Sequence, residues 1–160
     1  MKKRNKIDIL SENFTLDEFL DSTVAKINRL ENIPSYTHLK NIQKLVINIL
    51  QPLRDSWEKH CEINKLGTPS IIITSGYRCP LLNRLVGGAT NSAHKIGAAA
   101  DIIPSNDNLS EFATFVEQWI EGRDFDQLIL EKCDEHGTPQ WLHIGYINKQ
   151  GKQRKQILRT

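Results

Sequence analysis

Cysteine is scarce in this chain, and the few cysteines present form no recognisable pattern. There are three, Cys61, Cys79 and Cys133, which is an odd number with no C-x-x-C pair among them. This excludes a disulfide framework and a cysteine-based zinc finger. Reduced thiols are the simplest account, so we expect the protein to be made in a reducing compartment.

Long apolar runs are also missing. The first ten residues have a basic start, but their short apolar run is broken by Asp8, so they contain no signal-peptide core. No later stretch is long enough to span a bilayer. We therefore expect a protein without an integral membrane segment, synthesised in the cytoplasm, for which any extracellular role needs lysis or a separate export route.

Neither sign of charge dominates, because the formal net charge is only +2. Bulk electrostatics therefore predicts no nucleic-acid or membrane partner. The exception is local: after Ile147 the chain carries five cations and no acid, namely Lys149, Lys152, Arg154, Lys155 and Arg159. We interpret residues 148–160 as a solvated basic tail with, at most, a weak attraction to polyanions.

Patterns that are present place helices first and most strands later. Apolar residues recur at helical spacing from residue 36 to 60, with Pro52 expected to kink or divide that helix. The β-branched run around residues 71–75 predicts a buried strand, and residues 124–131 and 140–147 predict two more. The fold predicted is α+β: a single compact domain over residues 13–147, preceded by a lead-in of residues 1–12, with a small, mainly antiparallel sheet flanked by helices.

Strand alternation singles out an aspartate and a histidine. If residues 97–102 are extended, Asp101 shares a face with glycine and alanine only, and in the strand beginning at Trp141 the side chain of His143 points away from the core. His94 stands seven residues before Asp101. Two histidines and one aspartate offer three zinc ligands and leave a fourth position for water, as in catalytic zinc sites. His38 and His60, on the long helix, are read as ordinary residues.

Three motifs resemble one enzyme family. "SGYRCPLLNRLVGG", "SAHKIGAAAD" and "WLHIGY" occur in the order found in the zinc D-Ala-D-Ala carboxypeptidase and dipeptidase family, which includes phage endolysin-type L-alanyl-D-glutamate peptidases. The resemblance implies the hedgehog/D-Ala-D-Ala peptidase-like fold and Zn²⁺ held by His94, Asp101 and His143. It also implies that Arg78 stabilises negative charge on the substrate carbonyl, and that the enzyme acts as a carboxypeptidase or an endopeptidase on a peptidoglycan stem peptide that contains a D-amino acid.

The general base departs from the family pattern. Better-known members carry a glutamate three residues before the last histidine ligand, where this chain has Gln140. Glu131 is our candidate replacement, because it ends a strand that a hairpin would return towards His143. Asp134 and Glu135, in the connecting turn, are weaker candidates. The alternative is that Gln140 marks a catalytically impaired, cell-wall-binding module of the same fold.

Three further residues are predicted to contact substrate. Ser92 precedes the His94 loop, Gln140 replaces the usual glutamate, and Trp141 is an aromatic wall for the cleft. Gly97 and Ala99 would keep space free for metal and substrate, although a tight turn explains the glycine equally well.

Overall fold

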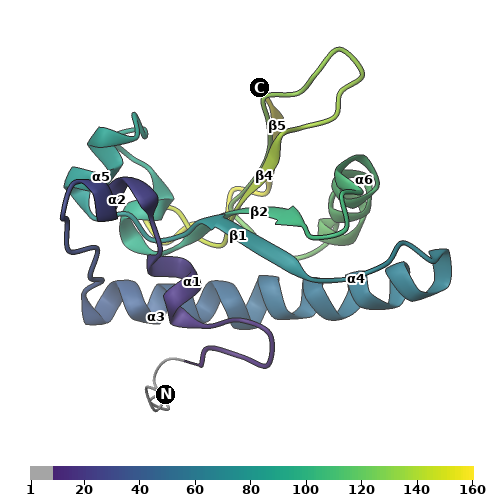
Figure 1. Cartoon of the computed structure of the whole chain (residues 1–160), viewed down its shortest axis with the longest axis horizontal. Coiled ribbons are helices and arrows are strands. Elements are labelled where there is room, and N and C mark those ends of the chain that lie inside the picture. The colour runs from purple at the N-terminus through teal and green to yellow at the C-terminus, as the bar shows by residue number, and fades with distance from the viewer. Residues whose placement is uncertain (1–8) are drawn as a thin grey trace.

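A long helical segment lies along one side of the molecule (Figure 1). The structure is a computed structural model that describes residues 9–160, and this segment comprises α3 (Tyr36–Leu45), a π-helical turn (Val46–Leu50) and α4 (Gln51–Asn64). Pro52 lacks an N–H and its ring clashes with the carbonyl four residues before it. The π-helical turn immediately before α4 widens the backbone there, so the break predicted at Pro52 takes the form of a changed hydrogen-bond pattern within one continuous segment.

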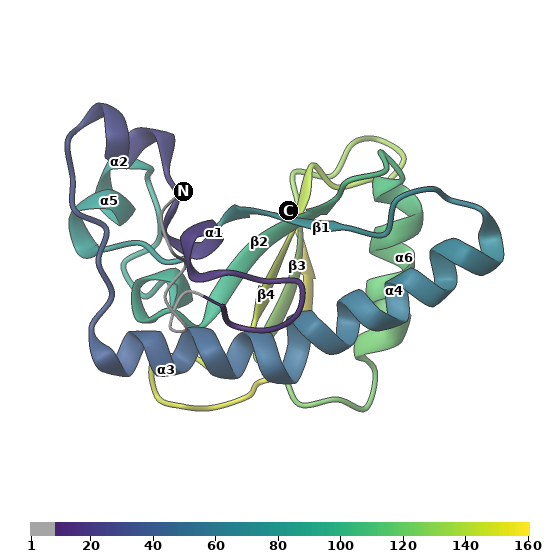
Figure 2. The same ribbon diagram turned by 60° about the horizontal axis from the view of Figure 1, so that its bottom comes forward.

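A five-stranded sheet stands above this helical segment (Figure 2). The strand order is β1-β2-β4-β3-β5, and every neighbouring pair is antiparallel except β3 and β5. The strands are β1 (Ile71–Ser75), β2 (Ala99–Pro104), β3 (Gln127–Glu131), β4 (Trp141–Gly145) and β5 (Gln156–Arg159). The predicted α+β class with a mainly antiparallel sheet is therefore confirmed.

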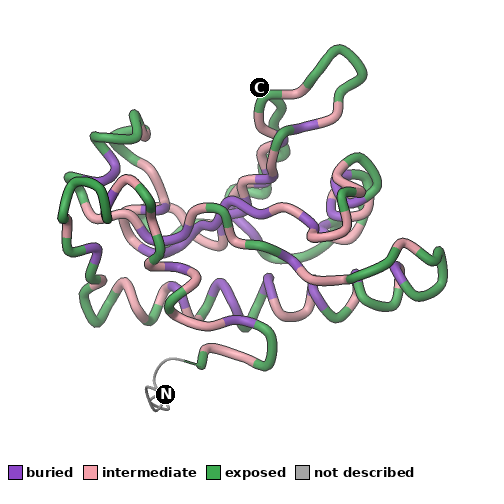
Figure 3. The backbone as a smooth tube through the Cα atoms, in the orientation of Figure 1, coloured by how far each residue is buried: buried purple, intermediate pink, exposed green. Residues whose placement is uncertain are grey.

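The core lies between the sheet and the helices. Buried side chains of the long helical segment, among them Ile42, Leu53 and Trp57, join Leu142 and Ile144 of β4 in one apolar cluster. The helix α6 (Leu109–Ile120) adds a second apolar surface to this cluster. Buried positions alternate with more exposed ones along the long helical segment and along β3 and most of β4, whereas β2 is buried over almost its whole length (Figure 3). One face of the sheet thus packs against the core, and the candidate functional site lies on the other face.

Short helices support the loops that enter the site. These are α1 (Leu16–Leu20), α2 (Thr23–Ile27), α5 (Pro80–Leu85) and the 3₁₀ helix η2 (Ala93–Ile96). The buried side chain of Asn32 ties several of them together, because its amide donates to the carbonyls of Leu20 and Tyr77 while its oxygen accepts the N–H of Cys79. The backbone on both sides of Arg78 is therefore held in place by one side chain.

One expectation from the sequence is wrong. Strand β1 was expected to be buried, but it is an edge strand on which exposed and covered positions alternate. Residues 148–160 are largely exposed, as expected of a solvated tail, but they are also held against the sheet. Strand β5 pairs with β3, and Arg154, Lys155 and Arg159 form ion pairs with Asp126, Asp124 and Glu117. These partners are distant in sequence, so no local pattern predicts the pairing.

The predicted lead-in over residues 1–12 lies mostly outside the described residues. Within residues 9–160, no helix combines the length and the apolar character needed to cross a bilayer.

Candidate metal and catalytic site

Two neighbouring strands bring Asp101 and His143 together. Asp101 of β2 pairs directly with His143 of β4, so their side chains leave the sheet on the same face. On that face His143 is next to Ile129 of β3, while Asp101 is next to Ser75 of β1. The alternation predicted from sequence is confirmed here, since Leu142 and Ile144 are buried in the core.

His94 reaches the same point from the 3₁₀ helix η2. Its ring is buried, and its Nδ1 lies 2.7 Å from the carbonyl oxygen of Gly76. A carbonyl can only accept, so Nδ1 carries the proton, and burial lowers the pKa of His94 more than its contact with Asp101 raises it. The ring is therefore neutral, and Nε2 presents a lone pair to the site. Such a hydrogen bond from the distal nitrogen is the usual way in which a metal-binding histidine is oriented.

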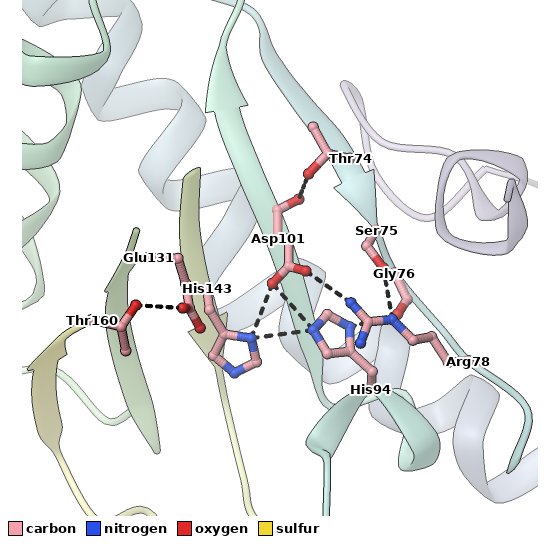
Figure 4. A network of polar contacts seen from close by, with 9 residues as sticks. All are labelled: Thr74, Ser75, Gly76, Arg78, His94, Asp101, Glu131, His143 and Thr160. Carbon is pink, nitrogen blue, oxygen red and sulfur yellow. Dashed lines mark hydrogen bonds and ion pairs between the residues drawn. The ribbon is translucent and has the colours of Figure 1, made fainter. Parts of the chain in front are cut away.

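Three potential ligand atoms converge (Figure 4). His94 Nε2 lies 3.2 Å from Asp101 Oδ1 and 3.2 Å from His143 Nδ1, and His143 Nδ1 lies 3.0 Å from Asp101 Oδ1. Zinc–ligand bonds of about 2.0–2.1 Å in a tetrahedron place the ligand atoms about 3.3 Å apart. The triangle therefore has nearly the dimensions of three corners of a tetrahedral zinc site.

Proton bookkeeping favours a cation at the centre of this triangle. A proton on His143 Nδ1 can form a hydrogen bond to either Asp101 or His94. The contact between His94 Nε2 and Asp101 Oδ1 then has no proton, because both atoms are hydrogen-bond acceptors. A single divalent cation bound by all three atoms removes that conflict. The residues present thus fit the predicted Zn²⁺ in number, type and spacing.

Arg78 contacts the same aspartate through its second oxygen. Its Nη2 donates to Asp101 Oδ2 at 2.9 Å, and its Nε donates to Ser75 Oγ at 2.9 Å. Burial alone would raise the pKa of Asp101, but its contacts with His143 and His94 outweigh burial and hold that pKa well below its usual range. The carboxylate is therefore ionised at neutral pH, ready to act as a ligand, and Arg78 also fixes its rotamer.

Glu131 lies on the same face at the end of β3. It pairs across strands with Trp141, while His143 pairs with Ile129, which makes Glu131 and His143 diagonal neighbours. Diagonal neighbours are about 7–8 Å apart at the backbone, within reach of long side chains. One carboxylate oxygen accepts the hydroxyl proton of Thr160 at 2.7 Å. Figure 4 shows Glu131 on the side of His143 away from Asp101.

One cavity of about 570 Å³ joins these groups. Besides His94, Asp101 and His143, its lining includes Arg78, Glu131, Ser92 and Trp141, all of which the sequence had singled out.

Three other acidic or polar candidates lie elsewhere. Gln140 is exposed and is not part of the cavity wall, and its backbone N–H pairs with the carbonyl of Glu131. Asp134 and Glu135 are exposed in the turn, where the Asp134 carboxylate accepts two backbone N–H groups. Of the carboxylates considered as replacement bases, only Glu131 lines the cavity.

Sequence reasoning missed several supporting groups. Glycine 76 and Ser75 contribute acceptors that orient His94 and Arg78, and Thr160 holds Glu131. Lys132 also lines the cavity, with its ammonium 5.2 Å from the centre of the Trp141 ring. Of the two explanations given for Gly97, the structure favours the tight turn, because its φ is positive and a Cβ there would lie 2.5 Å from the carbonyl oxygen of a residue in α3. None of these roles has a local sequence signal.

Comparison with known families adds an independent observation to this geometry. The model of a family described as Peptidase M15 matches residues 12–136. The chain belongs to the peptidase M15 family. A search of curated proteins found no match. M15 peptidases are metal-dependent, in agreement with the His-Asp-His group described above.

The matched range of this M15 peptidase contains two of the three candidate ligands. His94 and Asp101 fall within residues 12–136, as do Arg78 and Glu131, whereas His143 lies beyond the match. The third ligand is thus supported by the register between β2 and β4 and by the convergence of ligand atoms, without help from the family match.

Proposed function

We propose that this M15 peptidase is a zinc-dependent enzyme that hydrolyses a peptide bond in peptidoglycan stem peptides, which contain D-amino acids. The observation that carries the proposal is the convergence of His94, Asp101 and His143 in a cavity whose wall also holds a carboxylate, Glu131, and a guanidinium, Arg78. These are the parts that metal-assisted hydrolysis requires: a ligand set, a base and an electrophilic donor.

Zinc would be held by His94 Nε2, Asp101 Oδ1 and His143 Nδ1, a neutral-nitrogen and carboxylate set that it accepts readily. When bound, the ion supplies Lewis acidity, which polarises the substrate carbonyl and lowers the pKa of water to about 7. The protein prepares these ligands by hydrogen bonds to their other atoms, from His94 to Gly76 and from Arg78 to Asp101. This support keeps the ligand geometry in the absence of substrate.

Glu131 is the proposed general base. It lines the same cavity as the ligand triangle, and that cavity is large enough to hold a water molecule. The bond from Thr160 occupies one carboxylate oxygen and leaves the other to accept a proton from the attacking water. The same carboxylate then returns the proton to the leaving amine, which completes hydrolysis.

Arg78 is the proposed stabiliser of the oxyanion. Within residues 9–160 its hydrogen bonds use Nε and Nη2, so Nη1 has both protons to donate to a substrate oxygen. The guanidinium is fixed at two points and lines the cavity, so little reorganisation is needed as charge develops.

The choice of peptidoglycan rests on the resemblance of the three motifs to D-Ala-D-Ala and endolysin-type peptidases. We propose that the protein is made in the cytoplasm and meets the wall after lysis or through a separate export route. The alternative of an impaired wall-binding module rested on Gln140. Because Gln140 lies outside the cavity and Glu131 lies within it, the site supports the enzyme better.

Metal analysis combined with hydrolysis of purified peptidoglycan tests the proposal. We expect one zinc per chain and the release of new amino groups, both lost in His143→Ala. His136→Ala is the matched control, because His136 is exposed in the turn and outside the ligand group. Wall binding without new amino groups, by protein loaded with zinc, would establish the binding module instead.

A further inference from the structure

We infer that the substrate groove continues past Arg78 into a second cavity, which is a subsite for an extended peptide on the β1 side of the catalytic centre. The enzyme then cuts a bond inside a longer chain and does not only release a terminal residue. This inference rests on the proposed function and specifies its substrate.

The second cavity adjoins the first. It has a volume of about 310 Å³, at the lower end of the roughly 300–1,000 Å³ typical of ligand pockets. Arg78 and Val86 line both cavities, so the two meet at these side chains. The remaining wall of the second cavity comes from the start of α2, the end of β1 and α5, and consists of Asp21, Ser22, Thr23, Val24, Thr74, Ser75, Tyr77 and Leu82.

The candidate ligands lie in the middle of a row that crosses the sheet. From β1 to β3 the residues on the site face are Ser75, Asp101, His143 and Ile129, each paired with the next. Three strand spacings of about 4.8 Å give about 14 Å, the length of roughly four residues of extended peptide. A chain that runs along this row passes the ligand triangle at its centre and has contacts available on both sides.

The lining of the second cavity suits a peptide backbone. Hydroxyl groups from α2 and β1 can donate to carbonyls and accept from N–H groups. Three of them already have partners: Ser22 Oγ accepts the N–H of Ala25, Thr74 donates to the carbonyl of Asp101, and Ser75 Oγ accepts from Arg78 Nε.

Charge in the second cavity opposes a free carboxylate. Of the described residues that line it, Arg78 is the one cation; it is paired with Asp101, and its remaining donor group, Nη1, is the one proposed to stabilise the oxyanion. Asp21 supplies a negative charge, although an exposed Lys26 forms an ion pair with it. A carboxypeptidase that held the terminal carboxylate here would need an available cation. Neutral amide groups of a continuing chain fit this lining better.

A bulky side chain at the start of α2 tests the subsite. Thr23 is exposed and lines the cavity, so Thr23→Trp fills the subsite without disturbing the core. Ile27→Trp is the matched control, because Ile27 is on the same helix, is 74% exposed and is not part of the cavity wall. Mass spectrometry of digested peptidoglycan first identifies the scissile bond. Two synthetic peptides are then compared, both with acetylated and amidated ends. The shorter has one residue on each side of that bond, and the longer has two.

We expect the wild-type protein to cut the longer blocked peptide internally, with kcat/KM about tenfold above that for the shorter one. Thr23→Trp should abolish most of this preference, and Ile27→Trp should keep it. A Thr23→Trp protein with the wild-type preference would overturn the subsite. Release of only a terminal residue, and only from unblocked peptides, would overturn the internal cut while leaving the proposed function standing. No hydrolysis of peptidoglycan by the zinc-loaded protein would remove the proposed function, and this inference with it.

Discussion

Replacement of Glu131 by glutamine isolates proton transfer from every other feature of the site. The two side chains have the same shape, and the Thr160 hydroxyl, 2.7 Å from Glu131 Oε2, can donate equally well to an amide oxygen. The hydrogen bonds among His94, Asp101 and His143 do not involve Glu131, so the ligand triangle should keep its geometry. What glutamine cannot do is accept a proton from water.

The expected loss follows from the role of the base. A positioned general base contributes about 10²–10⁴ in rate, or roughly 3–5 kcal/mol of barrier at 1.36 kcal/mol for each factor of ten. We expect kcat to fall by that factor while KM changes little, because the lost interaction belongs to the transition state. The assay is the release of amino groups from purified peptidoglycan by zinc-loaded protein, with zinc content measured on the same preparation.

Two comparisons make this result decisive. Glu135→Gln is the same chemical change at an exposed position in the turn, away from the cavity wall, and should keep the wild-type rate. Gln140→Glu restores the residue type of better-known relatives, but its exposed position predicts no rescue of Glu131→Gln. If Glu131→Gln kept most of the rate while Glu135→Gln lost it, the base would have been assigned to the wrong carboxylate.

Two further predictions concern stability. Zinc at a hundred times its dissociation constant should stabilise the fold by about 2.7 kcal/mol. For a chain of this length, that stabilisation raises Tm by about 5–10 °C. A chelator should reverse the increase, and His143→Ala should not show it. Equal increases in the wild type and in His143→Ala would place the metal elsewhere. Gly97 and Gly151 share a φ of 73°, so alanine at either should cost about 1–2 kcal/mol, but only at Gly97 does a Cβ meet backbone, at 2.5 Å. Urea unfolding should therefore show Gly97→Ala losing about 1–3 kcal/mol more than Gly151→Ala, and equal losses would contradict the packing argument.

The proposed base, Glu131, ends β3, whereas the glutamate position of the family pattern immediately precedes β4. Gln140 and Glu131 are hydrogen-bonded neighbours at the end of the β3–β4 pair, yet only Glu131 lies on the face of the cavity. Alternation along β3 places Gln127, Ile129 and Glu131 on one face, and all three line the cavity. A carboxylate at the end of this strand therefore lies in the site because of the regular strand geometry.

The sequence by itself determined the features that depend on near neighbours. The side-chain period of two placed His143 on the site face, the period of the long helix identified its apolar face, and Pro52 marked the region where that helix changes its hydrogen-bond pattern. These patterns are readable because pleat, helical turn and proline ring are properties of a few consecutive residues. The predicted fold class followed from them.

Tertiary structure decided whatever joins residues far apart in the chain. The register that sets Asp101 opposite His143, the Gly76 carbonyl that fixes the His94 tautomer, and the pairing of β5 with β3 all depend on where separate elements dock. The ion pair of buried Asp126 with Arg154, which anchors the basic tail to the sheet, is of the same kind. Such contacts form between surfaces that only the folded chain brings together, so the local periodicity of the sequence does not predict them.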